Sequence, residues 1–303
     1  MPIVLAAPLT SPGGTGALNH ARSMSWTGFD GSFWDLTDVY GPMQLREGVK
    51  GLHMPPMTVF QSSTPLVPGA EIGGYSIDPR PVYWPLTFIA SSSDEWRRAY
   101  SDFFRSLHPT RPGIWKVGSG DDARTLPLTY TPDGGAYAFK SDPFVNGVAL
   151  IGLELVATRP LWRGKSIKQE FRADEPVDFI PAAPGDEYFP SPVATFSTAT
   201  IENPGDEPSY LLWTVEGPQS ELELGVDGAV IRVPFDVADG STLIIDTDPA
   251  GQYATLDGAD VTAALGFQMF GPVPARGRSP LTIRSAGAGA VTAELVPLYW
   301  TAA

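Results

Sequence analysis

Five Asp-Gly dipeptides, spread along the chain, constrain its fold more than any other feature. They are Asp30-Gly31, Asp133-Gly134, Asp227-Gly228, Asp239-Gly240 and Asp257-Gly258. Asp tolerates, and Gly favours, the positive φ angles of a type I′ turn, so such a pair between alternating apolar residues predicts a β-hairpin. The clearest case joins Leu222–Val226 to Ala229–Val233, and an aromatic one joins Trp26–Phe29 to Phe33–Leu36. We therefore expect a mainly β protein.

Other segments fit the same pattern. Strands are predicted at Val82–Ile89, Ile114–Val117, Leu126–Tyr130, Asn146–Val156 and Thr242–Asp246. Residues 93–108 differ, because their apolar side chains recur at helical spacing and form one face. These side chains are Trp96, Tyr100, Phe103, Phe104 and Leu107. Ser92 and Glu95 match a capping box and Pro109 follows as a stop, so we expect one amphipathic helix lying against a sheet.

The charge distribution divides the chain in two. Residues 1–165 carry 14 acidic and 14 basic side chains, whereas residues 166–303 carry 20 acidic and 6 basic ones. Prolines interrupt residues 166–192, which we interpret as a connector. We expect two β-sandwich or barrel-like domains, 1–165 with the helix and an acidic 166–303. A net charge of -14 argues against tight general binding to nucleic-acid phosphates, and we expect no specific nucleic-acid binding. The neutral first half is suited to contact with other protein chains, because charged residues are depleted at interface cores.

The sequence shows no export or membrane signal. The start of the chain has no basic segment, and Pro8 interrupts its apolar run. The most apolar later stretch, Val148–Val156, contains Glu154 and has the length of a strand. We expect no membrane insertion and synthesis in a cytoplasm.

A search for catalytic or metal-binding motifs gives no candidate. The chain has no Cys, and His20, His53 and His108 lack the spacing of metal ligands. No nucleophile elbow or phosphate-binding loop is present. The series from Asp246 to Asp257 resembles a calcium loop but has Ala250 at a ligand position, and hairpin turns explain the same residues. We predict no catalytic residue, no cofactor and no metal site.

Aromatic residues of the second half leave sugar binding open. Trp213, Tyr253, Tyr299 and Trp300 could stack on a sugar or belong to the core of a β-sandwich. The 34 acidic residues would also supply the carboxylate pair of a glycosidase, although so many acids make that signal unspecific.

The order of several motifs resembles one known family. In the first half they are Trp26–Leu36, Gly48–Met57, Arg80–Leu86 and Pro112–Val117, and in the second half Ile201–Tyr210 and Leu243–Thr247. This series is similar to the distal tail proteins (Dit) of long-tailed bacteriophages, often labelled minor tail proteins. The resemblance spans nearly the whole chain, and order and spacing carry it more than any single motif.

The resemblance implies a structural protein of the virion. It implies a hexameric ring formed by the N-terminal domains and a galectin-like or carbohydrate-module-like C-terminal domain. Such a ring joins the tail tube protein to the tail-tip hub of the baseplate, with the tape measure and receptor-binding proteins as further partners. The family has no catalytic residues to transfer.

One segment is a candidate for contacts between subunits. The apolar, Pro-bearing loop Leu52–Phe60 contains Met54, Met57 and Phe60, which have no evident place in a strand. The alternative is a loop that folds back onto its own core. A carbohydrate-binding adhesin module that contacts the host surface is the alternative function.

Overall fold

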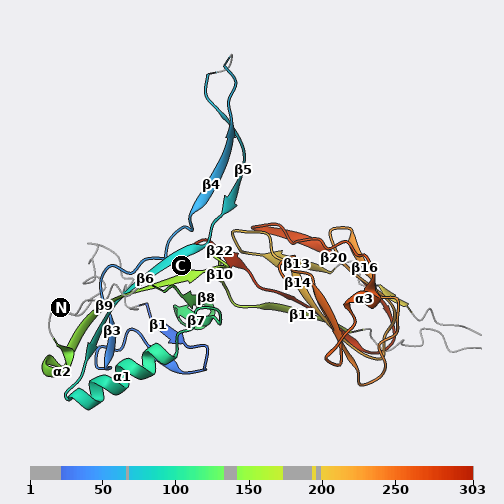
Figure 1. The fold of residues 1–303 in the computed structure, drawn as a ribbon. Coiled ribbons are helices and arrows are strands. Elements are labelled where there is room, and N and C mark those ends of the chain that lie inside the picture. Colours follow the sequence, from blue (N-terminus) through green and yellow to red (C-terminus); the bar gives the residue numbers. More distant parts are fainter. Residues whose placement is uncertain (1–21, 66–67, 133–141, 173–192, 196–198, 303) are drawn as a thin grey trace, which may run out of the picture. The chain divides into compact units, whose positions relative to one another are not determined.

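The computed structural model describes residues 22–65, 68–132, 142–172, 193–195 and 199–302. The chain is mainly β and divides into two compact units (Figure 1). The hairpin predicted at Asp133-Gly134, most of the Pro-rich segment and His20 lie outside the described residues.

The two units are not consecutive in the sequence. Unit 2 comprises Lys165–Leu298, and unit 1 comprises the chain up to Gly164 together with Tyr299–Ala303. Our expected second domain, 166–303, therefore included a terminal segment that the structure assigns to unit 1. Because unit 2 is inserted into unit 1 in the sequence, the last residues pack against residues far from them in sequence, such as Leu52.

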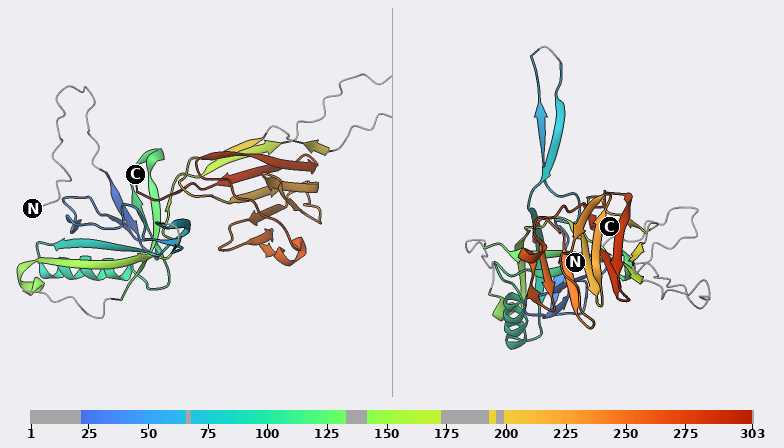
Figure 2. Two further views of the ribbon diagram at one scale, coloured as in Figure 1. Left: turned by 90° about the horizontal axis from the view of Figure 1, so that it is seen from above. Right: turned by 90° about the vertical axis from the view of Figure 1, so that its right-hand side faces the viewer.

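Unit 1 is built around a nine-stranded antiparallel sheet (Figures 1 and 2). Seven of its strands follow the order β2-β1-β7-β8-β9-β6-β3. The other two are β10, which pairs with β8, and β22, which pairs with β10. Its strands are β1 (Met24–Thr27), β2 (Phe33–Asp35), β3 (Met43–Leu45), β6 (Arg80–Ile89), β7 (Gly113–Val117), β8 (Arg124–Tyr130), β9 (Val148–Ala157), β10 (Trp162–Arg163) and β22 (Leu298–Tyr299). The predicted strands of the first half are thus confirmed, except that the strand expected from Asn146 begins at Val148, because Asn146 ends a short helix and Gly147 caps it.

Aromatic side chains fill the core of unit 1. Trp26, Trp84, Trp115 and Trp162 are each at most 1% exposed. Their rings follow one another at centroid distances of 5.4, 5.3 and 4.9 Å. The first two contacts are edge-to-face, the geometry that aromatic quadrupoles favour. Each tryptophan comes from a different strand, and buried positions alternate with accessible ones along β1, β7 and β9, so one face of the sheet is buried.

Helix α1 (Ser93–Arg105) confirms the predicted helix and shortens it, since Ser106 already caps its end. Ser92 Oγ accepts a hydrogen bond from Glu95 N at 3.2 Å, as the capping box requires. The reciprocal bond differs, because Glu95 Oε2 accepts from Ser91 N and Oγ. These bonds from Ser91 lower the pKa of Glu95. Buried Trp96 and Phe103 join the helix to the core. Short helices η1 (Gly120–Asp122) and α2 (Pro143–Asn146) complete the unit.

Unit 2 contains two antiparallel sheets. One has six strands: β11 (Ile167–Arg172), β21 (Ala290–Leu295), β14 (Leu211–Glu216), β17 (Thr242–Asp246), β18 (Tyr253–Leu256) and β19 (Ala259–Asp260). The other has five: β12 (Val193–Thr195), β20 (Gly277–Ala286), β15 (Ser220–Val226), β16 (Ala229–Arg232) and β13 (Thr200–Asn203). Helix α3 (Thr262–Leu265) follows β19. Residues 167–172, expected in the connector, form the regular strand β11 because they pair with β21 along its length.

Two of the Asp-Gly pairs in unit 2 form the expected turns. Asp227 and Gly228 have φ angles of 50° and 85°, and Asp257 and Gly258 have 50° and 81°. Both pairs join adjacent antiparallel strands. Asp239-Gly240 precedes β17, which pairs with β14 rather than with β16. This third pair is therefore a turn without a hairpin, because its flanking strands lie in different sheets.

Candidate assembly surfaces

A two-stranded hairpin stands clear of the sheet of unit 1 (Figures 1 and 2). Strands β4 (Met57–Ser62) and β5 (Glu71–Ile77) pair with each other in a separate sheet. We call residues 57–62 and 71–77 the arm. Nearly all its side chains are exposed or half-buried, so the unit's core does not stabilise it.

One face of the arm is apolar. Met57 pairs with Ile77, and Val59 pairs with Tyr75, so these four side chains lie on the same face of the hairpin. The opposite face carries the pair Thr58 and Ser76 and, next to them, Phe60 opposite Gly74. Val59 is 46% exposed and Tyr75 is 49% exposed.

The arm also has very little charge. Between Met54 and Ile77 the sequence contains one ionisable side chain at neutral pH, Glu71. A two-stranded hairpin alone is at best marginally stable in water. Its uncovered apolar face and its two unpaired edges are features that another protein chain can cover.

The structure corrects the predicted loop Leu52–Phe60, because Met57 onward belongs to strand β4. Met54 is 52% exposed, Phe60 is 54% exposed, and Met57 is half-buried. Phe60 follows Val59 and so lies on the face opposite to it. Met54 lies at the base of the arm, and Met57 and Phe60 lie along it; all three are at least partly exposed. Their role as interface residues stays a prediction.

Arg80, at the start of β6, ties the base of the arm to the unit. It is 1% exposed, and its guanidinium donates to the carbonyl oxygens of Gly51 at 2.8 Å, Pro160 at 2.7 Å, Trp300 at 2.7 Å and His53. Burial lowers the pKa of Arg80 to about 10, so the side chain stays cationic at neutral pH. Its planar group of five donors suits several acceptors at fixed positions.

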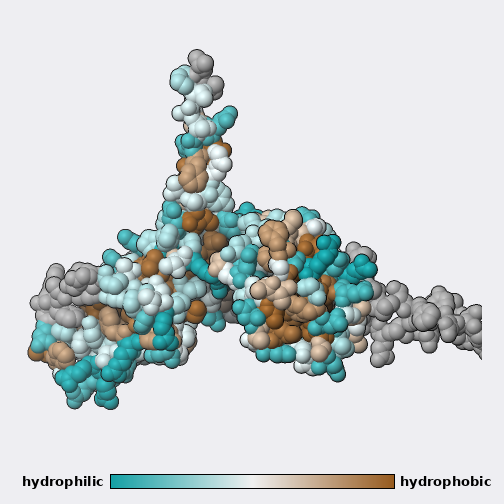
Figure 3. Space-filling model, turned by 45° about the vertical axis from the view of Figure 1, so that its right-hand side comes forward, coloured by the Kyte–Doolittle hydropathy of each residue, from teal (hydrophilic) through white to brown (hydrophobic). Residues whose placement is uncertain are grey.

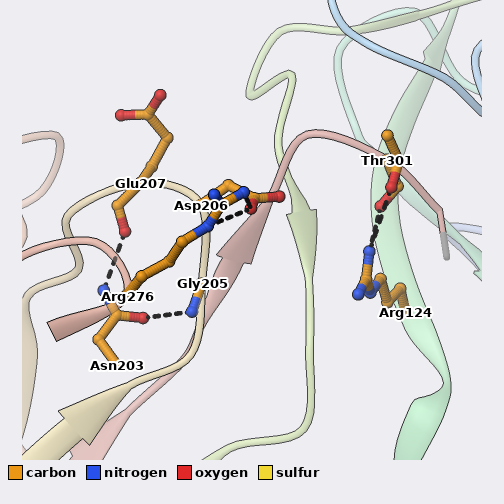
Figure 4. Close-up of polar contacts among 7 residues, drawn as sticks. All are labelled: Arg124, Asn203, Gly205, Asp206, Glu207, Arg276 and Thr301. Atoms are coloured by element: carbon orange, nitrogen blue, oxygen red, sulfur yellow. Dashed lines mark hydrogen bonds and ion pairs between the residues drawn. The ribbon is translucent and has the colours of Figure 1, made fainter.

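The last residues of the chain are held in unit 1 by a second arginine. Arg124 donates to Thr301 O at 2.7 Å (Figure 4), and its guanidinium lies 3.6 Å from the centre of the Tyr299 ring. Ala302 is buried, and its N–H donates to Leu52 O at 2.8 Å. The terminal segment is therefore an integral part of unit 1.

Unit 1 has a second exposed apolar surface, which we call the α2 patch. Its members are Ile89, Phe144, Val145, Val148 and Leu150, with Val145 80% and Leu150 71% exposed. Ile89 and Val148 are cross-strand partners, and α2 immediately precedes β9. The Arg97 guanidinium lies 5.3 Å from the centre of the Phe144 ring. Figure 3 shows that apolar surface is found on both units.

In unit 2, the motif Ile201–Tyr210 forms a hydrogen-bonded loop around buried Asn203 (Figure 4). Asn203 Nδ2 donates to Glu207 O at 2.9 Å and to Val273 O at 3.2 Å, and its Oδ1 accepts from Gly205 N at 2.9 Å. Arg276 forms an ion pair with Asp206. The residues of this motif therefore stabilise a loop within unit 2.

Asn203→Ala is expected to destabilise unit 2 by about 2 kcal/mol, because it leaves buried backbone groups without partners. Hydrogen exchange measured by mass spectrometry should show about 30-fold faster exchange in the slowest unit 2 peptides, and unchanged peptides in unit 1. Glu202→Ala is the control, since it removes only the exposed ion pair with Arg278. Equal protection in the Asn203 variant and the unaltered chain would contradict this assignment.

His108 and the aspartates of the loop that begins at Asp246 have local structural contacts. Backbone N–H groups of Thr110 and Arg111 donate to His108 Nδ1. In the loop that resembles a calcium site, Asp246 Oδ1 accepts from Asp248 N and Asp248 Oδ1 accepts from Ala250 N. Among the described residues, no three potential metal ligands gather, and no helix has the length and hydrophobicity to cross a bilayer.

The aromatic candidates for sugar stacking separate into different environments. Trp213 is 1% exposed and belongs to the core of unit 2, so its ring cannot serve as a platform. Tyr299 and Trp300, expected in the second domain, belong to unit 1 and are half-buried. Tyr253 is 43% exposed.

Comparisons with known proteins found likeness in structure only. No protein-family model matches the chain, and a search of curated proteins gave no match. The crystal structure of the Dit protein of SPP1, described as a paradigm of the hub adsorption apparatus in phages infecting Gram-positive hosts, superimposes with a TM-score of 0.61 at 15% identity. That match covers 92% of this chain and 99% of the SPP1 protein.

Two structures of the phage P2 baseplate in its activated conformation also match. The one with Ca gives a TM-score of 0.55 at 12% identity, and the one with Sr gives 0.53 at 13%. Each match covers 91% of this chain and 98% of the baseplate chain. The arrangement of strands and helix along the chain, which the sequence motifs already indicated, is therefore the fold of the Dit and baseplate hub proteins of phage tails.

Proposed function

We propose that this chain is a distal tail protein of a long-tailed bacteriophage. In this role six copies form a ring through unit 1, which joins the tail tube to the tail-tip hub of the baseplate. The structural likeness to SPP1 Dit over 99% of that protein carries the proposal. The role is structural rather than catalytic, and the protein is made in the host cytoplasm and incorporated into the virion.

The surfaces of unit 1 support contact between copies. The apolar face of the arm and the α2 patch are different surfaces of the same unit. A contact between different surfaces on two copies is heterologous and closes into a ring when the rotation permits. The nearly uncharged arm costs little desolvation when it is covered. Met57 and, at the base of the arm, Met54 belong to this proposed interface, whereas Phe60 lies on the opposite face of the arm and outside it.

Unit 2 has a separate place in the proposal. We propose that unit 2 is a galectin-like or carbohydrate-module-like domain. In this role it contacts the receptor-binding proteins. Its acidic surface favours solubility and opposes contact between equivalent surfaces of two copies. We therefore assign ring formation to unit 1.

Light scattering coupled to size-exclusion chromatography tests the proposal. The purified chain is expected to elute as a particle of about 194 kDa, six times the 32.4 kDa of one copy, and to form rings in negative-stain micrographs. A monomer that persists at high protein concentration would overturn the ring. Absence of the chain from purified phage particles would overturn the assignment to the virion.

A further inference from the structure

Unit 2 presents two apolar side chains on a short loop that follows α3. Phe267 is 97% exposed and Met269 is 64% exposed. The residues between and after them, Gln268 and Phe270, are half-buried. Outward and inward side chains thus alternate along residues 266–271, which we call the 266–271 loop.

The inward side chains fix the shape of this loop. Gln268 Oε1 accepts from Arg232 N at 3.0 Å, and Gln268 Nε2 donates to Arg232 O at 3.1 Å. Because Arg232 ends the edge strand β16, the glutamine amide covers part of that edge. Phe270 packs against the core of unit 2. The exposure of Phe267 and Met269 is therefore built into an anchored loop, which lowers the entropy lost when a partner binds.

Acidic residues dominate the sequence around the loop. Residues 246–275 contain Asp246, Asp248, Asp257 and Asp260 and no Lys, Arg or His. The backbone of Arg232 contacts the loop through Gln268, and its guanidinium is paired with Glu223. Asp260 Oδ1 accepts from Thr262 N at 2.9 Å, and Asp257 Oδ1 accepts from Thr242 N at 2.8 Å, so both carboxylates have fixed positions. Only Val261 and the four-residue helix α3 separate Asp260 from the loop, so this carboxylate acts on a surface that approaches the loop.

We infer that the 266–271 loop is a docking site for a different protein, whose contact surface has an apolar pocket bordered by Lys or Arg. A large exposed aromatic side chain on an anchored loop is the kind of residue that dominates binding energy. The aspartates add attraction for basic residues and repel an equivalent acidic surface of a second copy. The inference rests on the proposed function, which supplies a setting with several different structural proteins.

Site-specific photo-crosslinking in phage particles tests this inference. Benzoylphenylalanine is placed at position 267, and at the 95% exposed Tyr40 of unit 1 as a matched control. We expect position 267 to give one crosslinked product with another virion protein, through a peptide that contains Lys or Arg. The product should decrease at least tenfold when Asp257→Asn and Asp260→Asn are combined, since both changes remove charge and keep a side-chain acceptor.

Three results would overturn the inference. They are crosslinks from position 267 only to other copies of this chain, a yield no higher than from position 40, and a product that is insensitive to the two Asn substitutions. If the chain is present in the particles, these results leave the proposed function intact. If the chain is absent from the particles, the proposed function fails and the inference fails with it.

Discussion

A chain carrying Val59→Lys is expected to remain folded and to elute as a monomer of 32.4 kDa under conditions in which the unaltered chain forms the ring. Val59 lies on the apolar face of the arm and contributes nothing to the core of unit 1. A lysine there must be desolvated when a neighbouring copy covers the face, which costs several kcal/mol at each contact. Every copy carries the change, so every contact of the ring is weakened.

Ser62→Lys is the matched control for this experiment. It adds the same charge to the same strand on the opposite face, where the cross-strand partner is Glu71. We expect this control to assemble like the unaltered chain, and both variants to keep the same circular dichroism spectrum. Assembly of the Val59 variant into full rings would exclude the apolar face as the interface, and loss of its folded spectrum would assign Val59 to the fold.

Arg80→Met is expected to destabilise unit 1 by roughly 3 to 5 kcal/mol, since buried carbonyl groups lose the donors that Arg80 supplies. For a unit of this size that loss corresponds to a melting temperature lower by about 10 °C. The acceptors come from the segment before the arm, from the turn after β9 and from the end of the chain. Differential scanning calorimetry measures the shift, and hydrogen exchange locates it.

An exposed arginine of unit 1 provides the control for this second experiment. Arg105 forms a surface ion pair with Asp102 on helix α1, and Arg105→Met is expected to change stability by less than about 1 kcal/mol. In the Arg80 variant, peptides at the base of the arm and in the terminal segment should exchange faster than those of unit 2. A melting temperature within 2 °C of the unaltered chain would contradict the role of Arg80, because even one lost buried bond lowers it by about that much.

Local chemistry explains why several elements could be predicted from the sequence. The turn at Asp227-Gly228 follows from the φ angles that these two residues accept, and helix α1 follows from its apolar spacing and the Ser92 cap. Such preferences act within a few residues and need no knowledge of the fold. Met54, Met57 and Phe60 were chosen as interface candidates because they are apolar and have no evident periodic place in a strand, and that role stays a prediction. Strand β4 was missed because its partner β5 gives no recognisable signal in a sequence rich in Gly and Ser.

Composition and residue patterns are enough to predict a β-rich chain with an amphipathic helix, an electrically balanced half and an acidic half. The position of the apolar residues of the arm outside the core emerges only from the folded chain, because apolar alternation has the same period whether a face is covered by its own chain or by another. The folded chain also returns Tyr299–Ala303 to unit 1, and its Arg80 joins segments as far as 220 residues away. Contacts over such separations depend on how the sheets pack, and residue preferences acting over a few positions carry no information about them.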